Sequence, residues 1–194
     1  FLAGHQLHCR GQGSPTVVFE NGLGDLLEQW RQVQPKLTAR ACAYDRAGYG
    51  HSDAGPLPRT AQRIAQELHT LLAAAGERPP YLLVASSFGG YPARVYRGLY
   101  PNEVSGLVLV DCVQEDQYDL LPPSWQAISQ AMHERYAGQA RRAPWEVELG
   151  LLRLQLWWRG VHVSHLLLQT RYFVARNSEL ENIRARYAGA EPVR

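Results

Sequence analysis

The chain has 194 residues, of which 45% are apolar and 20% are charged, and its net charge is +2. This is the size of one domain and the composition of an ordinary globular protein. The small net charge and the scattered arginines argue against a nucleic-acid partner, and no run approaches the roughly 18 apolar residues of a membrane span. No signal pattern is visible in a chain that starts at Phe1, so a cytoplasmic location is only the default expectation.

Strand-like and helix-like segments alternate up to about residue 113. Apolar alternation and short β-branched or continuous apolar runs predict strands at 5–9, 16–20, 41–44, 81–85 and 104–110. Helical spacing predicts helices at 25–37, with Asp25 as N-cap, at 60–75, with Gly76 as the stop, and at 91–100. This order predicts an α/β protein with a mostly parallel, doubly wound sheet.

No strand is predicted after residue 113. Several helices are expected instead, with breaks near Pro122-Pro123, Pro144, Gly160 and Gly189. The apolar stretch 149–158 is interrupted by polar residues and predicts a buried or half-buried helix. The change in composition suggests two parts, a core at 1–113 and a helical region at 114–194.

The three cysteines Cys9, Cys42 and Cys112 are widely spaced and odd in number. That pattern is typical of neither a metal site nor a disulfide framework. Cys42 and Cys112 lie in or next to apolar runs, so we expect buried and unreactive thiols. A reducing compartment would fit this pattern.

Ser87 lies between a predicted buried strand and a predicted helix, with Ala85 two residues before it and Gly89 two residues after. This is the arrangement of a nucleophile elbow. The turn is so tight that the two flanking positions must be small, and alanine stands at the first of them, where glycine is usual. Ser86 lacks small residues at both positions, so Ser87 is the candidate nucleophile. The alternative is a serine in an ordinary strand-to-helix turn.

Three further segments accompany this elbow in the expected order. They are the Gly-rich loop Glu20-Asn21-Gly22-Leu23-Gly24, the stretch Asp45-Arg46-Ala47-Gly48-Tyr49-Gly50-His51-Ser52-Asp53, and the strand Gly106-Leu107-Val108-Leu109-Val110-Asp111. Together with the elbow they resemble the serine α/β-hydrolase family, of esterase and lipase type, over roughly residues 5–113.

The resemblance implies a mechanism. Ser87 would attack a carbonyl carbon, the backbone N–H groups of Leu23 and Phe88 would form the oxyanion hole, and water would release the acyl group. It implies a small-molecule acyl substrate and no metal or nucleotide cofactor. A serine nucleophile argues against epoxide-hydrolase and dehalogenase chemistry, which use a carboxylate. The stretch around Arg46 is expected to be structural, and residues 114–194 would correspond to a cap.

The catalytic acid and base are harder to place. The family's order is serine, acid, histidine, and no strand that could carry the last two is predicted after Asp111. We therefore expect a chain truncated before the last strands, with an incomplete sheet, and nearly inactive towards esters. Asp111 could be the acid or a polar strand end. Three histidines come late enough to be the base but are expected in helices, where packing or solvated roles are usual: His133, His162 and His165. His51 precedes Ser87, the wrong order.

The later region is rich in bulky apolar groups, which would either line an apolar substrate pocket or pack the cap. They are Tyr118, Leu120, Leu121, Trp125, Trp145, Leu151, Leu152, Trp157 and Trp158. Two other functions stay open: a non-catalytic binding protein of this fold, and a hydrolase of an amide, thioester, lactone or carbon–carbon bond. The oligomeric state is not predicted.

Overall fold

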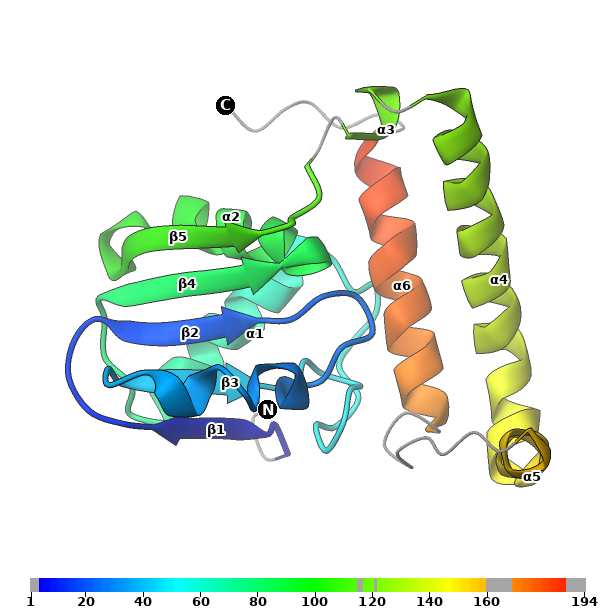
Figure 1. Cartoon of the computed structure of the whole chain (residues 1–194), viewed down its shortest axis with the longest axis horizontal. Coiled ribbons are helices and arrows are strands. Elements are labelled where there is room, and N and C mark those ends of the chain that lie inside the picture. The colour runs from blue at the N-terminus through cyan, green and yellow to red at the C-terminus, as the bar shows by residue number, and fades with distance from the viewer. Residues whose placement is uncertain (1–3, 115–116, 121, 160–168, 188–194) are drawn as a thin grey trace.

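Five strands form one sheet in the order β1-β3-β2-β4-β5. The computed structural model describes residues 4–114, 117–120, 122–159 and 169–187 (Figure 1). The strands are β1 (Leu7–Arg10), β2 (Thr16–Glu20), β3 (Ala41–Tyr44), β4 (Tyr81–Ser86) and β5 (Val104–Val110). β1 is antiparallel to β3, and the other neighbours are parallel. The predicted α/β class and all five predicted strands are confirmed.

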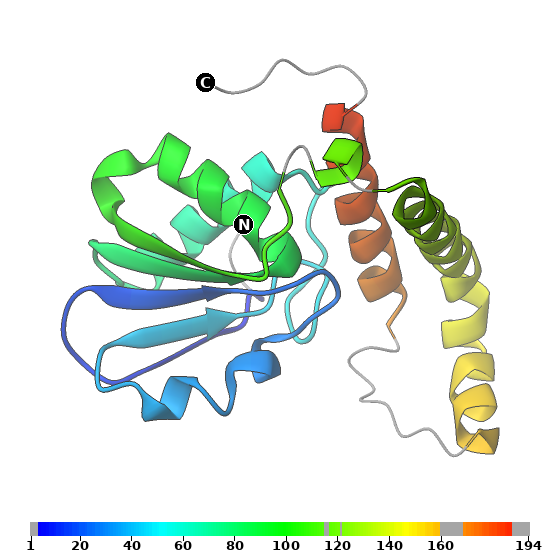
Figure 2. The ribbon, with the colours of Figure 1, turned by 45° about the horizontal axis from the view of Figure 1, so that its top comes forward.

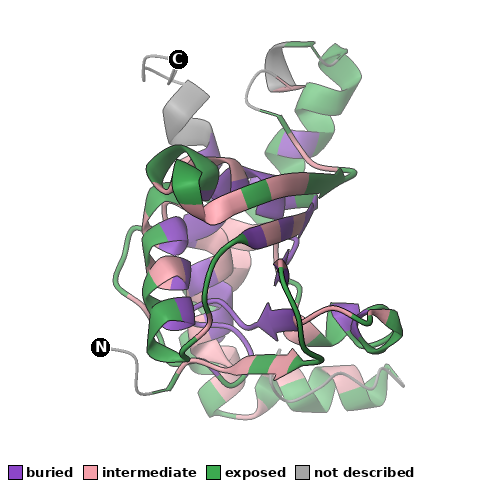
Figure 3. Cartoon of the chain, turned by 90° about the vertical axis from the view of Figure 1, so that its left-hand side faces the viewer, coloured by how far each residue is buried: buried purple, intermediate pink, exposed green. Residues whose placement is uncertain are grey.

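One face of the sheet is covered by α1 (Ala61–Ala74) and α2 (Gly90–Leu99). The Thr60 side chain caps α1 by accepting a hydrogen bond from the N–H of Arg63, and Gly76 ends the helix with a φ of +74°. The apolar stripe of α1 is buried, as its spacing predicted. The short helix η4 (Pro101–Glu103) connects α2 to β5. Buried residues gather in the strands and on the inner sides of the helices (Figure 3).

The other face is covered by two short 3₁₀ helices, η1 (Leu27–Trp30) and η2 (Gln34–Lys36). The prediction of one helix over 25–37 is therefore wrong. Pro35 lacks an N–H and disfavours helical geometry at the residue before it, which breaks the segment. The side chain that accepts a hydrogen bond from the first turn is Asp45, 2.8 Å from the N–H of Leu27, and not the predicted Asp25.

The helical region contains α3 (Gln117–Leu120), α4 (Pro123–Glu148), α5 (Leu151–Trp158) and α6 (Thr170–Tyr187). α4 continues through Pro144, where a break was predicted. The adjacent Ala143 is buried against aromatic side chains of α6, and this packing holds the helix together despite the lost backbone hydrogen bond. The breaks predicted at Gly160 and Gly189 lie outside the described residues.

α6 stands across the carboxyl ends of the parallel strands, between the sheet and α4 (Figures 1 and 2). It contacts α4, and it binds the core loops through hydrogen bonds that Tyr172 and Arg171 donate. The division into a core at 1–113 and a cap at 114–194 stays a prediction, because α6 is joined to both parts.

The expectation for the apolar residues of α4 and α5 also needs correction. Helix 149–158 is not buried: Trp157 and Trp158 are 69% and 77% exposed. Most of the bulky groups expected in a pocket or in cap packing face solvent, namely Leu120, Trp125, Trp145, Leu151, Trp157 and Trp158, whereas Leu152 packs against Tyr49 and its neighbours. Leu121 lies outside the described residues. Helical periodicity shows which residues share the apolar face of a helix, but not whether another element packs against that face. None of the described helices has the length and apolar character that a bilayer span requires.

The prediction of free cysteine thiols is also wrong for one pair. Cys9 and Cys42 face each other on the antiparallel strands β1 and β3 and form a disulfide, so Cys42 is not a free thiol. Cys112 is free and half-buried, and burial raises the pKa of its thiol. The pairing depends on strand register, which wide spacing in the sequence does not reveal.

The outer strand β5 exposes apolar side chains at its carboxyl end: Val108, Leu109 and Val110 are 44–49% exposed. An apolar strand edge favours pairing between molecules, and lysine on such an edge opposes it. We expect Val108→Lys to raise the concentration at which the protein begins to scatter light, with a change in unfolding free energy of about 0.5 kcal/mol or less. Leu107→Lys is the matched control. Leu107 packs against the core, so a lysine there should destabilise the fold. Unchanged scattering in a folded Val108→Lys protein would contradict the prediction.

Candidate active site

Ser87 begins the short helix η3 (Ser87–Gly89), directly after β4 and before α2. Its φ is +48°, in the left-handed region that a serine rarely adopts. The residue is exposed, whereas its neighbours on both sides are buried. A strained backbone that lifts one side chain to the surface is the geometry expected of a nucleophile elbow.

The flanking positions show why the turn needs small residues. A Cβ atom on Gly89 would lie 2.6 Å from the carbonyl oxygen of Asn21 and 2.7 Å from that of Glu20. Ala85, at the other position, is fully buried. The elbow therefore packs against the end of β2 with no room for a larger side chain at Gly89.

The two adjacent serines differ in environment. The Ser86 hydroxyl is buried and accepts a hydrogen bond from the Gln29 amide at 3.0 Å. The Ser87 hydroxyl has no hydrogen-bond partner among the described residues and faces solvent. Only Ser87 is free to meet a substrate.

The Gly-rich loop after β2 lies against the elbow. A Cβ atom on Gly22 would be 3.5 Å from the Cβ of Ser87. The Asn21 side chain fixes the start of this loop, because it donates to the carbonyl of Tyr44 at 2.8 Å and accepts from the indole N–H of Trp30 at 2.6 Å. The loop therefore lies beside the start of η3, whose first N–H groups have no partner within the helix.

The guanidinium of Arg46 is buried beside this loop and lies 5.1 Å from the centre of the Phe88 ring. Burial would lower the pKa of Arg46, but ion pairs with Glu179 and Glu20 outweigh it and hold the pKa well above its ordinary value. Arg46 is therefore a permanent positive charge beside the elbow. Burial raises the pKa of Asp25, at the far end of the loop, and Arg46 acts in the opposite direction.

The candidates for acid and base are distributed as follows. Val110, the last residue of β5, pairs with Ser86, and Asp111 comes directly after it; Asp111 is exposed and has a φ of +48°. His133 is buried on α4, and His51 is exposed. His162 and His165 lie outside the described residues. Within the described residues, no histidine is hydrogen-bonded to Ser87.

Three residues escaped the sequence analysis. Arg46 was expected to be structural, and Glu179 and Tyr172 on α6 were not singled out. Arg46 and Tyr172 bind the loop next to Ser87, and Glu179 binds Arg46. The position of Arg46 directly after an apolar strand, in a glycine-rich stretch, was the available signal for it. No local signal marks Glu179, because its partner is 133 residues away.

Other parts of the described chain offer less for chemistry. A cavity of about 380 Å³ lies at the amino ends of the parallel strands, opposite Ser87, and Arg40, Glu77 and Arg78 line it. Cys9, Cys42 and Glu77 are close enough together to suggest a metal site. The two sulfurs are joined in the disulfide and the Glu77 carboxylate binds Arg40, so this group does not fit a metal ion.

Known proteins resemble the chain in sequence. The sequence profile of the α/β-hydrolase fold family matches residues 15–148. YqjL of Bacillus subtilis is 30% identical over 166 residues, which are 84% of this chain and 64% of that protein. A Gibberella zeae protein named as an AB hydrolase superfamily protein is 34% identical over 113 residues, 55% of this chain and 35% of that protein. The chain thus spans less than two thirds of the length of these relatives.

Solved structures share the fold over nearly the whole chain. A Pseudomonas aeruginosa protein assigned as an epoxide hydrolase has a TM-score of 0.74 and 14% identity, covering 97% of this chain and 69% of its own. A Salmonella enterica protein assigned as an acyltransferase has a TM-score of 0.70 and 17% identity, covering 95% of this chain and 69% of its own. At these identities the likeness shows the fold alone.

The packing of the elbow gives a stability prediction. We expect Gly89→Ala to destabilise the protein by about 1–3 kcal/mol, because the added methyl group would press on two backbone carbonyls. Gly98→Ala is the matched control: Gly98 is exposed on the same helix with nothing near its Cβ position, and alanine there should stabilise the helix by up to about 1 kcal/mol. Urea denaturation measures both, and equal midpoints for the two variants would refute the packing of the elbow.

Proposed function

The chain belongs to the α/β-hydrolase fold family, and from this we propose that it is a serine hydrolase in which Ser87 attacks the carbonyl carbon of an ester or related acyl compound. One observation carries the proposal: Ser87 is exposed in a left-handed backbone at the carboxyl end of a buried strand, directly before a helix. A strained, exposed serine in that position is the arrangement that presents a nucleophile.

In the proposed reaction the Ser87 hydroxyl loses its proton as the oxygen bonds to the carbonyl carbon. The carbonyl oxygen becomes an anion, which the backbone N–H groups of Leu23 and Phe88 stabilise. The tetrahedral intermediate expels the alcohol, which takes up a proton, and leaves an acyl group on Ser87. Water then attacks the acyl-enzyme by the same route and releases the acid.

The nucleophile decides between the chemistries found on this fold. A serine forms an acyl-enzyme from a carbonyl compound, whereas opening an epoxide requires a carboxylate nucleophile. Leu23 and Val113, which are partly buried, pack against a buried apolar cluster that contains Phe88, Leu180 and Ile183. Because Phe88 adjoins Ser87, we expect an apolar acyl group. Asp111 comes directly after β5, and the β4–β5 register supports it as the candidate acid.

The second candidate function is a non-catalytic binding protein of the same fold. The observation that favours it is that no histidine among the described residues is hydrogen-bonded to Ser87. Without a base the serine is a weak nucleophile, although an oxyanion hole and substrate binding alone still accelerate hydrolysis by ~10³ over water.

A fluorophosphonate probe separates the two functions. We expect slow covalent labelling of the purified chain at Ser87, detected by mass spectrometry, and none in Ser87→Ala. Ser86→Ala is the matched control and should still be labelled, because Ser86 is buried and bound to Gln29. If the folded wild-type chain is not labelled, or if label is found on another residue, the hydrolase proposal fails.

Ester turnover tests whether Ser87 has a catalytic base. We expect the 194-residue chain to hydrolyse a p-nitrophenyl ester only weakly, because no histidine of the described part is hydrogen-bonded to Ser87. Rapid turnover that is lost in Ser87→Ala would be the contrary result. His133→Gln would then show whether the buried histidine of α4 supplies the base.

A further inference from the structure

We propose that Glu179 of α6 is a positioning residue for the oxyanion hole, which it orients through Arg46. The inference rests on the proposed function, in which Ser87 is the nucleophile and the N–H of Leu23 is a donor. It assigns to α6, a helix far from the elbow in the sequence, a part in building the site.

Arg46 uses all five of its N–H groups. Nη1 donates to Glu20 Oε1 at 2.9 Å and to the carbonyl of Asn21 at 2.7 Å. Nη2 donates to the carbonyl of Gly22 at 2.8 Å and to Glu179 Oε2 at 3.0 Å. Nε donates to Glu179 Oε1 at 3.1 Å. The guanidinium is thus held between two carboxylates, and its Nη1 and Nη2 groups also bind two successive carbonyls of the Gly-rich loop.

These carbonyl contacts set the direction of the donors. In a trans peptide the C=O and the N–H of one peptide plane point in opposite directions. Holding the Gly22 carbonyl on Arg46 therefore turns the N–H of Leu23 away from Arg46, and holding the Asn21 carbonyl does the same for the N–H of Gly22. Because Gly22 lies against the Cβ of Ser87, the loop presents these amides at the elbow.

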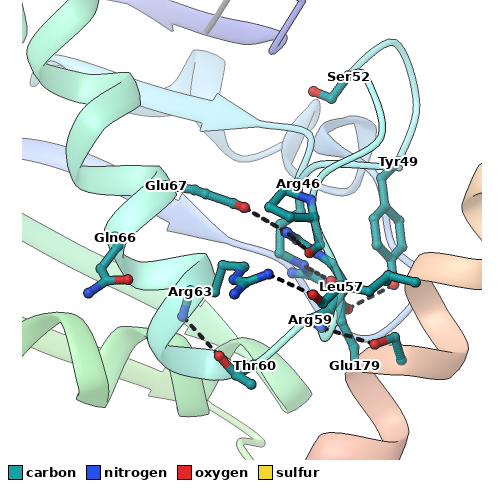
Figure 4. A network of polar contacts seen from close by, with 12 residues as sticks. Arg46, Tyr49, Ser52, Leu57, Arg59, Thr60, Arg63, Gln66, Glu67 and Glu179 are labelled. Carbon is teal, nitrogen blue, oxygen red and sulfur yellow. Dashed lines mark hydrogen bonds and ion pairs between the residues drawn. The ribbon is translucent and has the colours of Figure 1, made fainter. Parts of the chain in front are cut away.

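Glu179 orients the Arg46 guanidinium that holds the two loop carbonyls. Its carboxylate is fully buried and takes both the Nε and the Nη2 edge of Arg46, a two-bond contact that fixes the plane of the group (Figure 4). The Tyr49 hydroxyl donates to the same carboxylate at 2.8 Å. A second residue of α6 acts on the same loop, because the Tyr172 hydroxyl donates to the carbonyl of Gly24 at 3.0 Å.

Contacts other than those of Glu179 also hold α6 in place. The neighbouring Ser178 accepts a hydrogen bond from the N–H of Arg59 at 2.9 Å, and Arg171 donates to the carbonyl of Gly50 at 3.1 Å. The apolar contacts of Leu180 and Ile183 with Phe88 and Tyr91 add to these. A conservative change at Glu179 should therefore leave the helix docked and disturb mainly the orientation of Arg46.

The first test follows the amides directly and does not depend on activity. We compare ¹⁵N–¹H NMR spectra of the wild-type chain, Glu179→Gln and Glu181→Gln. Glu181 is the matched control, because it is exposed on the same helix and bonds only to Asn177. The amide signals of Gly22 and Leu23 should move in Glu179→Gln and stay in place in Glu181→Gln, with both proteins folded. Unmoved Gly22 and Leu23 signals in folded Glu179→Gln would overturn the proposal.

A second variant covers the case in which Glu179→Gln does not fold. Glu179→Asp keeps the charge next to Arg46 and withdraws the carboxylate by one methylene, so it should displace the same two amide signals by a smaller amount. If the Asp variant is folded and its Gly22 and Leu23 signals match those of the wild type, the proposal is wrong.

The second test measures fluorophosphonate labelling of Ser87. In Glu179→Gln the misplaced donors should lower the maximal rate of labelling roughly tenfold, which is less than the loss from removing an oxyanion donor outright. The probe concentration that gives half of this maximal rate should not change. Leu107→Ala, which weakens packing at distant β5, controls for lost stability and should keep the wild-type rate. A wild-type rate in folded Glu179→Gln would overturn the proposal. If the wild-type chain is not labelled at all, the proposed function fails, and the amide signals alone decide the positioning role.

Discussion

The buried guanidinium of Arg46 is the interaction on which the rest of this structure depends. It is 1% exposed, and its two carboxylate partners are equally buried. A charge removed from water must be paired and fully hydrogen-bonded, and breaking such a group by removing one partner costs about 3–5 kcal/mol. Arg46 meets this requirement only when the end of β2, the Gly-rich loop and α6 are all in place. One side chain thus binds the end of β2, the loop that follows it and the distant helix α6 into a single geometry.

The position of this group explains the form of the site. Parallel strands bring their carboxyl ends to one edge of the sheet, and the loops after β2, β3 and β4 meet there. In the elbow, Gly89 packs against the carbonyls of Glu20 and Asn21. The elbow and the Gly-rich loop are therefore in direct backbone contact. Arg46 then fixes the opposite side of the same loop. The backbone around Ser87 is held from both sides, and strain at one residue is maintained by packing at several others.

In the proposed mechanism the described residues supply the nucleophile and the groups that stabilise the anion, but no histidine hydrogen-bonded to Ser87. The proposed nucleophile and backbone donors come from the first 90 residues, and the proposed orientation of one donor depends on α6. Proton transfer requires a further group. The apolar side chains on α4, on α5 and at the edge of β5 face solvent.

The sequence by itself determined the order of strands and helices, the elbow at Ser87 and the Gly-rich loop beside it. These features depend on local periodicity and on small residues at fixed spacing, which neighbouring positions reveal. It did not determine the broken helix at 25–37, the continuation of α4 through Pro144, the exposure of Trp157 and Trp158, or the Cys9–Cys42 disulfide. Each of these follows from a register or a packing partner elsewhere in the chain. The same holds for the contact between Arg46 and Glu179, because only the tertiary structure brings together a loop and a helix 133 residues apart.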